Sequence, residues 1–320
     1  MTTKKTSFEK AMDELLDEAH DLSRRSLQEF SDIDPASLKM LMAGWPRVKP
    51  ERRRLLLDKL QDVADNDTLV CFDDFARAML TDDDSQVRAR AIRLLAECDD
   101  AKLAASFIKI LASDDDVNTR TEAAFALGKY VELGELEEIP EKTRRQVEDA
   151  LLEKVNSEDK SGVRRVALEA LGYSSRPEVL TLIESSFRRE DPEWQASALR
   201  AMGNSSDERW EEQVISHMLD VNPHVRLAAV EAAGDLGLSA ARMLLFKVLE
   251  DEDDDDVVGA AIWSLSQIGG EDVRIFIENL IDRAEDDEQT EFLEDALDNL
   301  AFTEDMSHFD LMSFDADEEE

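Results

Sequence analysis

The chain has 320 residues, enough for two ordinary domains or for one elongated array. Hydrophobic residues make up 42% of the chain and aromatic residues only 6%, a composition typical of packed helices that argues against large β-sheets. The formal net charge of -39 repels polyanions, so binding to DNA, RNA or anionic lipid is disfavoured.

The two cysteines and the N-terminus bear on cellular location. Cys71 and Cys98 stand beside apolar residues in helical patterns, which predicts buried thiols of a reducing compartment and argues against a disulfide framework or a metal cluster. The N-terminal segment has no uninterrupted apolar run that would serve as a signal or a membrane span. We therefore expect a cytoplasmic protein without a membrane partner.

Residues 1–33 are predicted to form an N-terminal capping helix. Apolar side chains fall on one side of such a helix, where they would cover the first repeat: Phe8, Met12, Leu15, Ala19 and Leu22.

The segment Trp45 to Arg54, WPRVKPERRR, is the one dense basic stretch of the sequence. Three consecutive arginines on a helix point about 100° apart, so they cannot all face one row of phosphates. We predict that the segment pairs with acidic segments of this chain or of a partner rather than with a nucleic acid.

An internal repeat follows, with the pattern acidic cluster, Val-Arg, Ala, Leu, Gly. The Arg position of this pattern, here called the anchor, is occupied by Arg88, Arg120, Arg164, Gln195, Arg226 and Val258. Successive anchors lie 32, 44, 31, 31 and 32 residues apart, so one interval carries about a dozen extra residues, near Val131 to Glu141. Degenerate copies at Lys49 to Ala64 and Asp286 to Ala301 flank the series.

Each repeat is predicted to contain two helices. The third residue after the anchor is always Ala, and the fourth and seventh are always apolar, which defines one stripe of an α-helix. A second amphipathic helix precedes it, as at Leu103 to Leu111 and Ala240 to Leu249. Prolines mark the expected helix starts, at Pro35, Pro50, Pro140, Pro177, Pro192 and Pro223, and three of them follow a capping residue, Asp34, Asp191 or Asn222.

From Asp34 to Ala301 this pattern resembles the HEAT-like repeats of phycobilin lyases. The resemblance implies an all-α, right-handed α-solenoid of about eight HEAT-like helical hairpins over residues 34–301. It further implies that Asp and Arg columns form a hydrogen-bonded ladder between repeats and that the second helices line the concave face. We therefore interpret the column Arg88, Arg120, Arg164 and Arg226 as structural.

A partner would touch the positions of the second helices that the core does not use. The fifth residue after each anchor is Arg93, Phe125, Glu169, Arg200, Glu231 or Trp263. Four of these are charged, so the two aromatic residues either mark a contact surface or fold back into the core. Neighbouring Arg90, Lys129 and Arg165 make a basic ribbon that would receive an acidic peptide, unless they pair with Glu97, Glu122 and Glu169. The predicted partner-binding residues are Arg90, Arg93, Phe125, Lys129, Arg165, Arg200 and Trp263.

No catalytic, cofactor-binding or metal-binding residues are predicted. HEAT-like metal hydroxylases use paired His-Glu dipeptides, but none of the four histidines here, His20, His217, His224 and His308, is followed by Glu. His217 and His224 are separated by the helix break at Pro223 and make a poor metal site.

The C-terminal segment 302–320 mixes Phe, Met and Leu with acidic residues and ends in DADEEE. Three interpretations stay open: a docking peptide for a partner, a tail that occupies the chain's own groove, and a cover for the last repeat.

These observations predict a protein-binding scaffold or adaptor that works through the concave face of a solenoid and is not an enzyme. Two alternatives come from other classes: a small-molecule or chromophore-handling enzyme of the lyase type, and an acidic nucleic-acid mimic that sequesters a basic protein. The partner is expected to be a protein, not a nucleic acid.

The charge predicts a salt dependence of stability. Carboxylates on stacked repeats repel one another when salt does not screen them. At 0.1 M salt the Debye length is about 10 Å, so repulsion between exposed charges further apart than this is largely screened. We expect the melting temperature to rise as sodium chloride is increased from 10 to about 200 mM. A melting temperature that does not respond to salt, measured by circular dichroism, would contradict the prediction.

Overall fold

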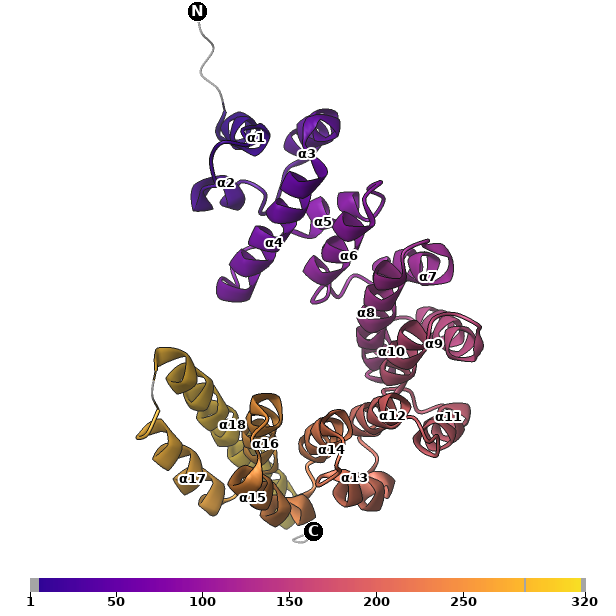
Figure 1. The fold of residues 1–320 in the computed structure, drawn as a ribbon, viewed down its shortest axis with the longest axis vertical. Coiled ribbons are helices and arrows are strands. Elements are labelled where there is room, and N and C mark those ends of the chain that lie inside the picture. Colours follow the sequence, from indigo (N-terminus) through magenta and orange to yellow (C-terminus); the bar gives the residue numbers. More distant parts are fainter. Residues whose placement is uncertain (1–5, 285, 318–320) are drawn as a thin grey trace, which may run out of the picture. The chain divides into compact units, whose positions relative to one another are not determined.

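The computed structural model describes residues 6–284 and 286–317, with side chains described up to Asp305. Helices account for nearly all of the regular structure, and the described residues contain no β-strand. The chain divides into two compact units, unit 1 ending at Ala170 and unit 2 beginning at Leu171. The expected all-α architecture is confirmed (Figure 1).

Unit 1 begins with two short helices and continues as helical hairpins, in which a first helix is followed by a second. Its helices are α1 (Ser7–Leu16), α2 (Arg24–Gln28), α3 (Pro35–Gly44), the 3₁₀ helix η1 (Trp45–Arg47), α4 (Pro50–Asn66), α5 (Asp73–Met79), α6 (Ser85–Leu94), α7 (Leu103–Ser113), α8 (Val117–Glu135), α9 (Glu141–Asn156) and α10 (Ser161–Leu171). The second helices α4, α6 and α8 contact one another in sequence.

Unit 2 repeats the same hairpin. Its helices are α11 (Pro177–Phe187), α12 (Pro192–Asn204), η2 (Glu208–Trp210), α13 (Glu211–His217), α14 (Pro223–Asp235), η3 (Ser239–Ala241), α15 (Arg242–Asp251), α16 (Asp255–Ile268), α17 (Glu271–Ile281) and α18 (Asp287–Asp317). The second helices α12, α14, α16 and α18 again contact one another in sequence. From α3/α4 to α17/α18 the helices pair into eight hairpins, as predicted.

Helix starts follow the predicted proline and capping signals. Asp34 accepts hydrogen bonds from the N–H groups of Ala36 and Ser37, and Asp191 and Asn222 cap α12 and α14 in the same way. The exception is Pro140, which is the N-cap of α9 rather than its first residue.

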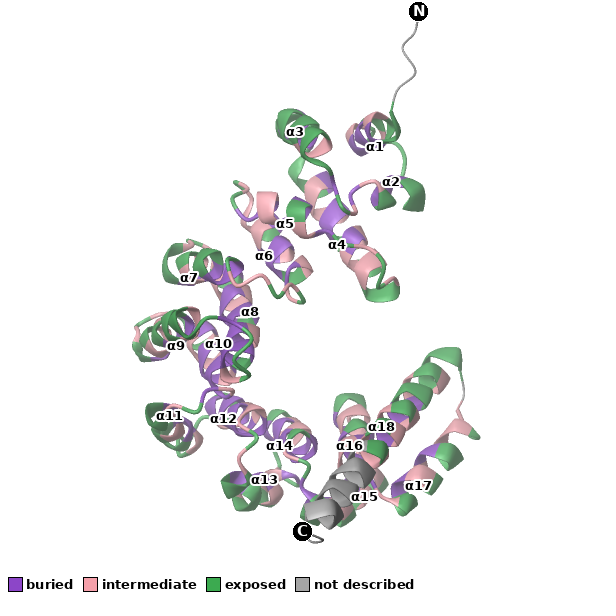
Figure 2. Ribbon diagram, turned by 180° about the vertical axis from the view of Figure 1, so that it is seen from behind, coloured by how far each residue is buried: buried purple, intermediate pink, exposed green. Residues whose placement is uncertain are grey.

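The core lies between neighbouring second helices and between the two helices of each hairpin. All six alanines at the third position after the anchor have no exposed surface: Ala91, Ala123, Ala167, Ala198, Ala229 and Ala261. The fourth and seventh positions are buried too, as the periodicity predicts. Figure 2 shows this burial along α8, α12 and α14, whereas α7, α9 and α11 are exposed over much of their length.

The repeat's glycine permits a close approach of backbones. A Cβ atom on Gly234 would lie 2.7 Å from the Cα of Ser264 on the next second helix, and one on Gly172 would lie 2.6 Å from the carbonyl oxygen of Ala201. Only hydrogen fits in these spaces, so the glycine column belongs to the packing between repeats.

The predicted arginine ladder is present at the ends of the hairpins. Arg88 donates two hydrogen bonds to the carboxylate of Asp114, at 2.8 and 2.7 Å, and one to the carbonyl oxygen of Asp82 at 2.8 Å. The guanidinium group thereby joins the turn of its own hairpin to the turn of the next. Bidentate geometry of this kind is the strong form of an arginine–carboxylate pair.

The same connection recurs along the chain. Arg120 binds Asp159 at 2.9 and 2.6 Å and the carbonyl oxygen of Asp114 at 2.7 Å. In unit 2, Arg226 binds both carboxylate oxygens of Glu252. The structural interpretation of this column is therefore confirmed at these three positions. Arg164 donates to the carbonyl oxygen of Val155, within its own hairpin.

Hydrogen bonds from the ladder keep its carboxylates ionised. The bond from Arg120 lowers the pKa of Asp159 far below its usual range, against the opposing effect of burial, and Lys154 adds to the lowering. For Asp114, burial raises the pKa, but the hydrogen bonds from Arg88 and from the Asp116 N–H outweigh it, so the pKa is lowered. Some of the chain's carboxylates are thus ionised and form ion pairs between repeats.

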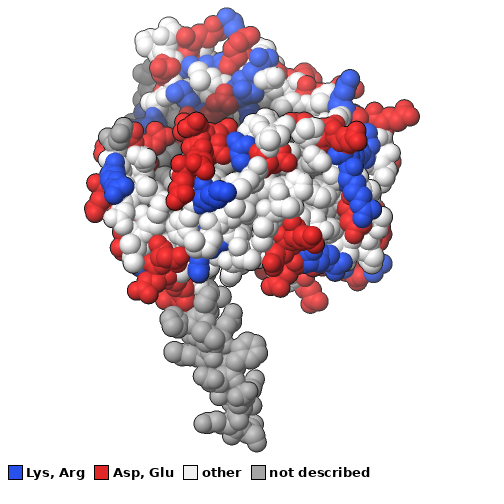
Figure 3. Space-filling view, turned by 60° about the horizontal axis from the view of Figure 1, so that its bottom comes forward, with Lys and Arg blue, Asp and Glu red and all other residues white. Residues whose placement is uncertain are grey.

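The basic stretch in α4 is also occupied by internal contacts. Arg53 donates to the carboxylate of Asp82 and to the Trp45 carbonyl oxygen, and Arg54 binds Asp84. Arg53 and Arg54 therefore pair with the chain's own acidic residues, which is the first of the two predicted alternatives. Figure 3 shows one face of the molecule, on which acidic side chains are interspersed with basic ones.

The N-terminal segment consists of two short helices, so the prediction of a single capping helix over residues 1–33 is wrong. Helix α1 ends at Leu16, which leaves Ala19 exposed, whereas Phe8, Met12 and Leu15 are buried as predicted. The buried guanidinium group of Arg52 caps the end of α1, because it donates to the carbonyl oxygens of Glu14, Asp17 and His20. The ring of Phe30 packs between those of Phe8 and Phe75.

Two further expectations need correction or delimitation. Cys71 is exposed in the loop before α5 and Cys98 is half-buried after α6, so neither is a buried helical thiol. The predicted boundary between residues 301 and 302 falls inside α18, and the side chains of the tail beyond Asp305 lie outside the described residues.

Replacing a ladder arginine should destabilise the fold in a pH-dependent way. We expect Arg120→Met to lower the free energy of unfolding by on the order of 3 kcal/mol at pH 7, because it leaves a largely buried carboxylate without its main partner. Since Asp159 has a lowered pKa in the folded state, the stabilisation is complete above the unfolded pKa of about 4 and is lost as the pH falls below it. The difference from the wild type should therefore narrow below about pH 4.

The matched control is Arg145→Met, which removes an exposed pair with Glu141 on α9. Chemical denaturation from pH 7 to pH 3 should show a change of less than about 1 kcal/mol for this variant. Equal losses for both arginine variants would contradict a structural ladder.

Candidate partner-binding surface

The second helices of each unit expose one side that the core does not use, here called the second-helix face. All seven predicted partner-binding residues lie on second helices. In unit 1 these are Arg90 and Arg93 on α6, Phe125 and Lys129 on α8, and Arg165 on α10; in unit 2 they are Arg200 on α12 and Trp263 on α16.

Basic residues of this face in unit 1 are held by carboxylates of neighbouring repeats. Arg90 binds Asp58 of α4 at 2.6 Å, and Arg93 forms a hydrogen-bonded pair with Glu122 of α8. Lys129 lies 3.2 Å from Glu97 and 3.0 Å from Asp99. Of the acids predicted as partners, Glu97 pairs with Lys129 and Glu122 with Arg93, whereas Arg90 pairs with Asp58. Binding of an acidic peptide by the ribbon stays a prediction.

The two carboxylates beside Lys129 favour the protonated form of its amine. Burial lowers the pKa of its amine, but hydrogen bonds from the amine to Asp99 and Glu97 outweigh this, so the pKa is raised. In unit 2, Arg200 is paired in the same manner with Glu231 of the next second helix, at 3.0 Å.

The two aromatic residues of the face differ in exposure. Phe125 is 66% exposed, and Trp263 is 38% exposed. Phe125 follows Glu122 by three residues and precedes Lys129 by four, so all three share one side of α8. The ring of Phe125 therefore stands between two inter-repeat ion pairs, Arg93–Glu122 and Lys129–Glu97. We call this cluster the Phe125 surface.

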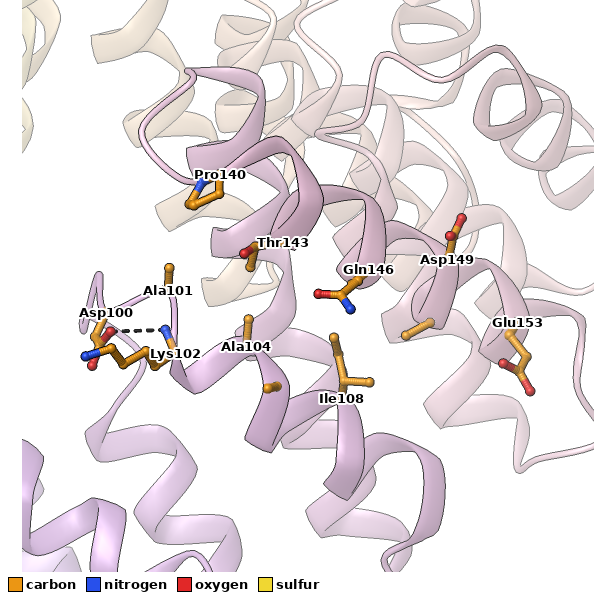
Figure 4. A pocket seen from close by; sticks show the side chains of 12 residues that line it. Asp100, Ala101, Lys102, Ala104, Ile108, Pro140, Thr143, Gln146, Asp149 and Glu153 are labelled. Atoms are coloured by element: carbon orange, nitrogen blue, oxygen red, sulfur yellow. Dashed lines mark hydrogen bonds between the residues drawn. The ribbon is translucent and has the colours of Figure 1, made fainter.

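Sequence reasoning missed a cavity of about 810 Å³ in unit 1, between the first helices α7 and α9 (Figure 4). Its lining residues are Asp100, Ala101, Lys102, Ala104, Ala105, Ile108, Pro140, Thr143, Gln146, Asp149, Ala150 and Glu153. The available signal was the dozen-residue excess in one repeat interval, together with the alanines that surround the start of α7.

His217 and His224 contact different residues. The ring of His217 packs edge-on against Phe187, at 4.9 Å between ring centroids, and His224 lies 3.4 Å from Glu193. In the described part of the chain, no group of three or more His, Cys, Asp or Glu residues is arranged to hold a metal ion. None of the described helices combines the length and apolar character needed to cross a membrane.

Comparison with solved structures finds helical-repeat proteins. The complex of CpcE and CpcF of phycocyanin lyase from Nostoc sp. PCC7120 is similar at 20% identity, with a TM-score of 0.47 over 71% of this chain and 94% of that one. Kap121p bound to Pho4p shares 16% identity, with a TM-score of 0.44 over 70% of this chain and 26% of that one. Human deoxyhypusine hydroxylase in complex with glycerol shares 16% identity, with a TM-score of 0.35 over 82% and 95%.

No curated protein matches the sequence significantly. The sequence model of HEAT repeats matches residues 73–141, 179–265 and 212–301, which together make up more than half of the chain. The matched ranges include Arg88, Arg120 and Arg226 of the ladder and every alanine of the stripe except Ala167. The chain therefore belongs to the HEAT repeat family.

Proposed function

We propose that the chain is a protein-binding scaffold that engages its partner through the Phe125 surface. The observation that carries the proposal is the 66% exposure of Phe125 on a long helix whose neighbouring side chains are otherwise charged and paired. Exposing a large aromatic side chain to water has an unfavourable hydration free energy in the free protein. Burial of the ring against a partner removes this cost and so favours binding.

The surroundings of Phe125 suit a binding hot spot. Helix α8 packs against α6, α7 and α9, so the ring is presented by a rigid element at low entropic cost. The ion pairs on either side, Arg93–Glu122 and Lys129–Glu97, would form a polar rim around a central aromatic residue. Hot spots have this arrangement, with an aromatic anchor surrounded by contacts that exclude water.

The rim contributes orientation rather than much affinity. Each of its pairs is partly exposed to solvent, where a single ion pair contributes at most about 1 kcal/mol. Charges at a rim act mainly on the rate of association and on the choice of partner.

The test replaces Phe125 by Ala and uses Leu136→Ala as the matched control. Leu136 is the C-cap residue of α8 and is 62% exposed, so both variants remove an exposed apolar side chain from the same region. Neither should change the free energy of unfolding by more than about 0.5 kcal/mol. Affinity capture with quantitative mass spectrometry should show partner recovery reduced about tenfold or more by Phe125→Ala and unchanged by Leu136→Ala.

A photo-crosslinking amino acid at position 125 identifies which captured proteins touch the surface. The proposal fails if the two variants recover the same proteins in the same amounts, or if no protein crosslinks at position 125.

A further inference from the structure

One end of the Phe125 surface carries more negative than positive charge. The amine of Lys129 lies 3.2 Å from Glu97 and 3.0 Å from Asp99, so two carboxylates share one cation. The Lys129 side chain is only 24% exposed, whereas that of Glu97 is 96% exposed and that of Asp99 is mostly exposed too. These three side chains, here called the acidic end, therefore present a net negative charge to solvent.

Other charged residues close to the acidic end in the sequence do not reverse this balance. The carboxylate of Asp100 pairs with Arg77 at 2.9 Å. Two further side chains are exposed, Lys102 at the start of α7 and Glu132 on α8, and their charges have opposite sign. The excess of negative charge at Glu97 and Asp99 therefore remains.

The carboxylates of the acidic end keep acceptor sites for a further donor. Lys129 donates a hydrogen bond to Oε2 of Glu97 and lies nearest to Oδ1 of Asp99. An ionised carboxylate has about four lone-pair sites on its two oxygens. Because both carboxylates extend into solvent, a cationic group of another molecule can bind them on the side away from Lys129.

The other end of the Phe125 surface has the opposite polarity. Arg93 pairs with Glu122, and in this pair the cation is the more exposed member. Arg93 and Phe125 are each the fifth residue after their anchors, so they lie at the same level of two second helices that contact each other, α6 and α8. Arg93 repels a cationic ligand, which is therefore favoured at the acidic end and not at this one.

The ring of Phe125 lies beside the acidic end. Phe125 and Lys129 are four residues apart on α8, which makes their side chains neighbours on the helix surface. The face of an aromatic ring attracts a cation within about 6 Å of its centroid. Among side chains, arginine suits both features, because its planar guanidinium group stacks on rings and its N–H groups bind carboxylates in pairs. The ammonium group of lysine is more strongly hydrated and lacks the planar shape.

We propose that the Phe125 surface recognises an arginine of the partner protein, whose guanidinium group stacks on the ring of Phe125 and donates to the carboxylates of Glu97 and Asp99. This inference rests on the proposed function, because it names the chemistry of the partner at the same surface. The net charge of -39 acts in the same direction, since it attracts cationic segments from a distance. Attraction at a distance does not select a site, so the decisive comparison is between variants of equal net charge.

The test uses the peptide Gly-Leu-Arg-Leu-Arg-Gly with an N-terminal trifluoroacetyl group, whose fluorine NMR signal reports binding to any variant of the full chain. Three comparison peptides carry lysine, glutamate or citrulline in place of both arginines; citrulline keeps the planar shape and lacks the charge. In about 0.15 M sodium chloride we expect the arginine peptide to bind about tenfold more tightly than the glutamate and citrulline peptides, and more tightly than the lysine peptide. In a chain with 4-fluorophenylalanine at position 125, the arginine peptide should also shift the fluorine signal of that ring.

Two double variants of equal net charge locate the bound arginine. Glu97→Gln with Asp99→Asn removes two charges at the acidic end, whereas Asp83→Asn with Asp115→Asn removes two exposed charges from the turns before α6 and α8. The first double variant should weaken binding of the arginine peptide about tenfold, and the second by less than about twofold. Thermal melting shows whether both double variants are folded.

Two single substitutions separate the ring from the positive end. Phe125→Leu keeps an apolar side chain but removes the aromatic face, so it should weaken binding of the arginine peptide about threefold or more. Arg93→Gln removes the cation that repels the ligand, so it should tighten binding about twofold. Weaker binding by Arg93→Gln would show that the surface takes an acidic ligand instead.

Several outcomes would overturn the inference. These are no binding of the arginine peptide, equal binding of the citrulline or glutamate peptide, equal effects of the two double variants, and an unchanged fluorine signal at position 125.

Partner recovery in the affinity capture separates this inference from the proposed function. If Phe125→Ala reduces recovery of a partner but Glu97→Gln with Asp99→Asn does not, the scaffold function stands and the recognition of arginine is wrong. If Phe125→Ala leaves recovery unchanged, the proposed function itself is wrong, whichever peptide binds.

Discussion

The packing of one second helix on the next through buried alanines is the interaction on which the rest of the structure depends. The side chain of alanine at this position is only a methyl group, so neighbouring helices can approach closely, and the glycine five residues further along, as at Gly234 after Ala229, lacks even the Cβ atom where backbones meet. A repeat has no core of its own and buries its apolar stripe only against its neighbours. Within each unit the second helices therefore pack side by side in sequence, which leaves one side of each of them uncovered by the next.

The negative charge of the chain is organised by this packing. The acidic clusters before the second helices supply N-caps, as Asp116 does for α8, and ladder carboxylates, as Asp114 does for Arg88. The second-helix face adds a further set of pairs between repeats, such as Arg90 with Asp58. Arginines that suggest a binding site in the sequence are thus largely used for contacts between repeats, and the exposed Phe125 stands out against them.

Features that depend on a fixed helical period were predictable from the sequence, and those that depend on how helices approach one another were not. The stripe at Ala123 and Leu127 and the ladder at Arg120 follow from spacing alone, because residues three, four and seven apart share a side of a helix. The cavity between α7 and α9 depends instead on how the helices approach one another, as at Gly134, where the Arg144 side chain leaves no room for a Cβ atom, and no spacing in the sequence reveals this. Likewise, the carbonyl oxygens of Asp17 and His20, just after the end of α1, are bound by Arg52, which is distant in the sequence.

The free energy of unfolding of Ala261→Leu, compared with that of Ala260→Leu, tests the packing most directly. Both alanines lie in α16, but Ala261 has no exposed surface, whereas Ala260 is partly exposed. A leucine at position 261 would force α16 away from its neighbours and should cost about 1–3 kcal/mol, whereas a leucine at position 260 should change the stability by less than about 0.5 kcal/mol. Equal effects of the two substitutions would contradict the account, because the buried alanine column would then not set the distance between repeats.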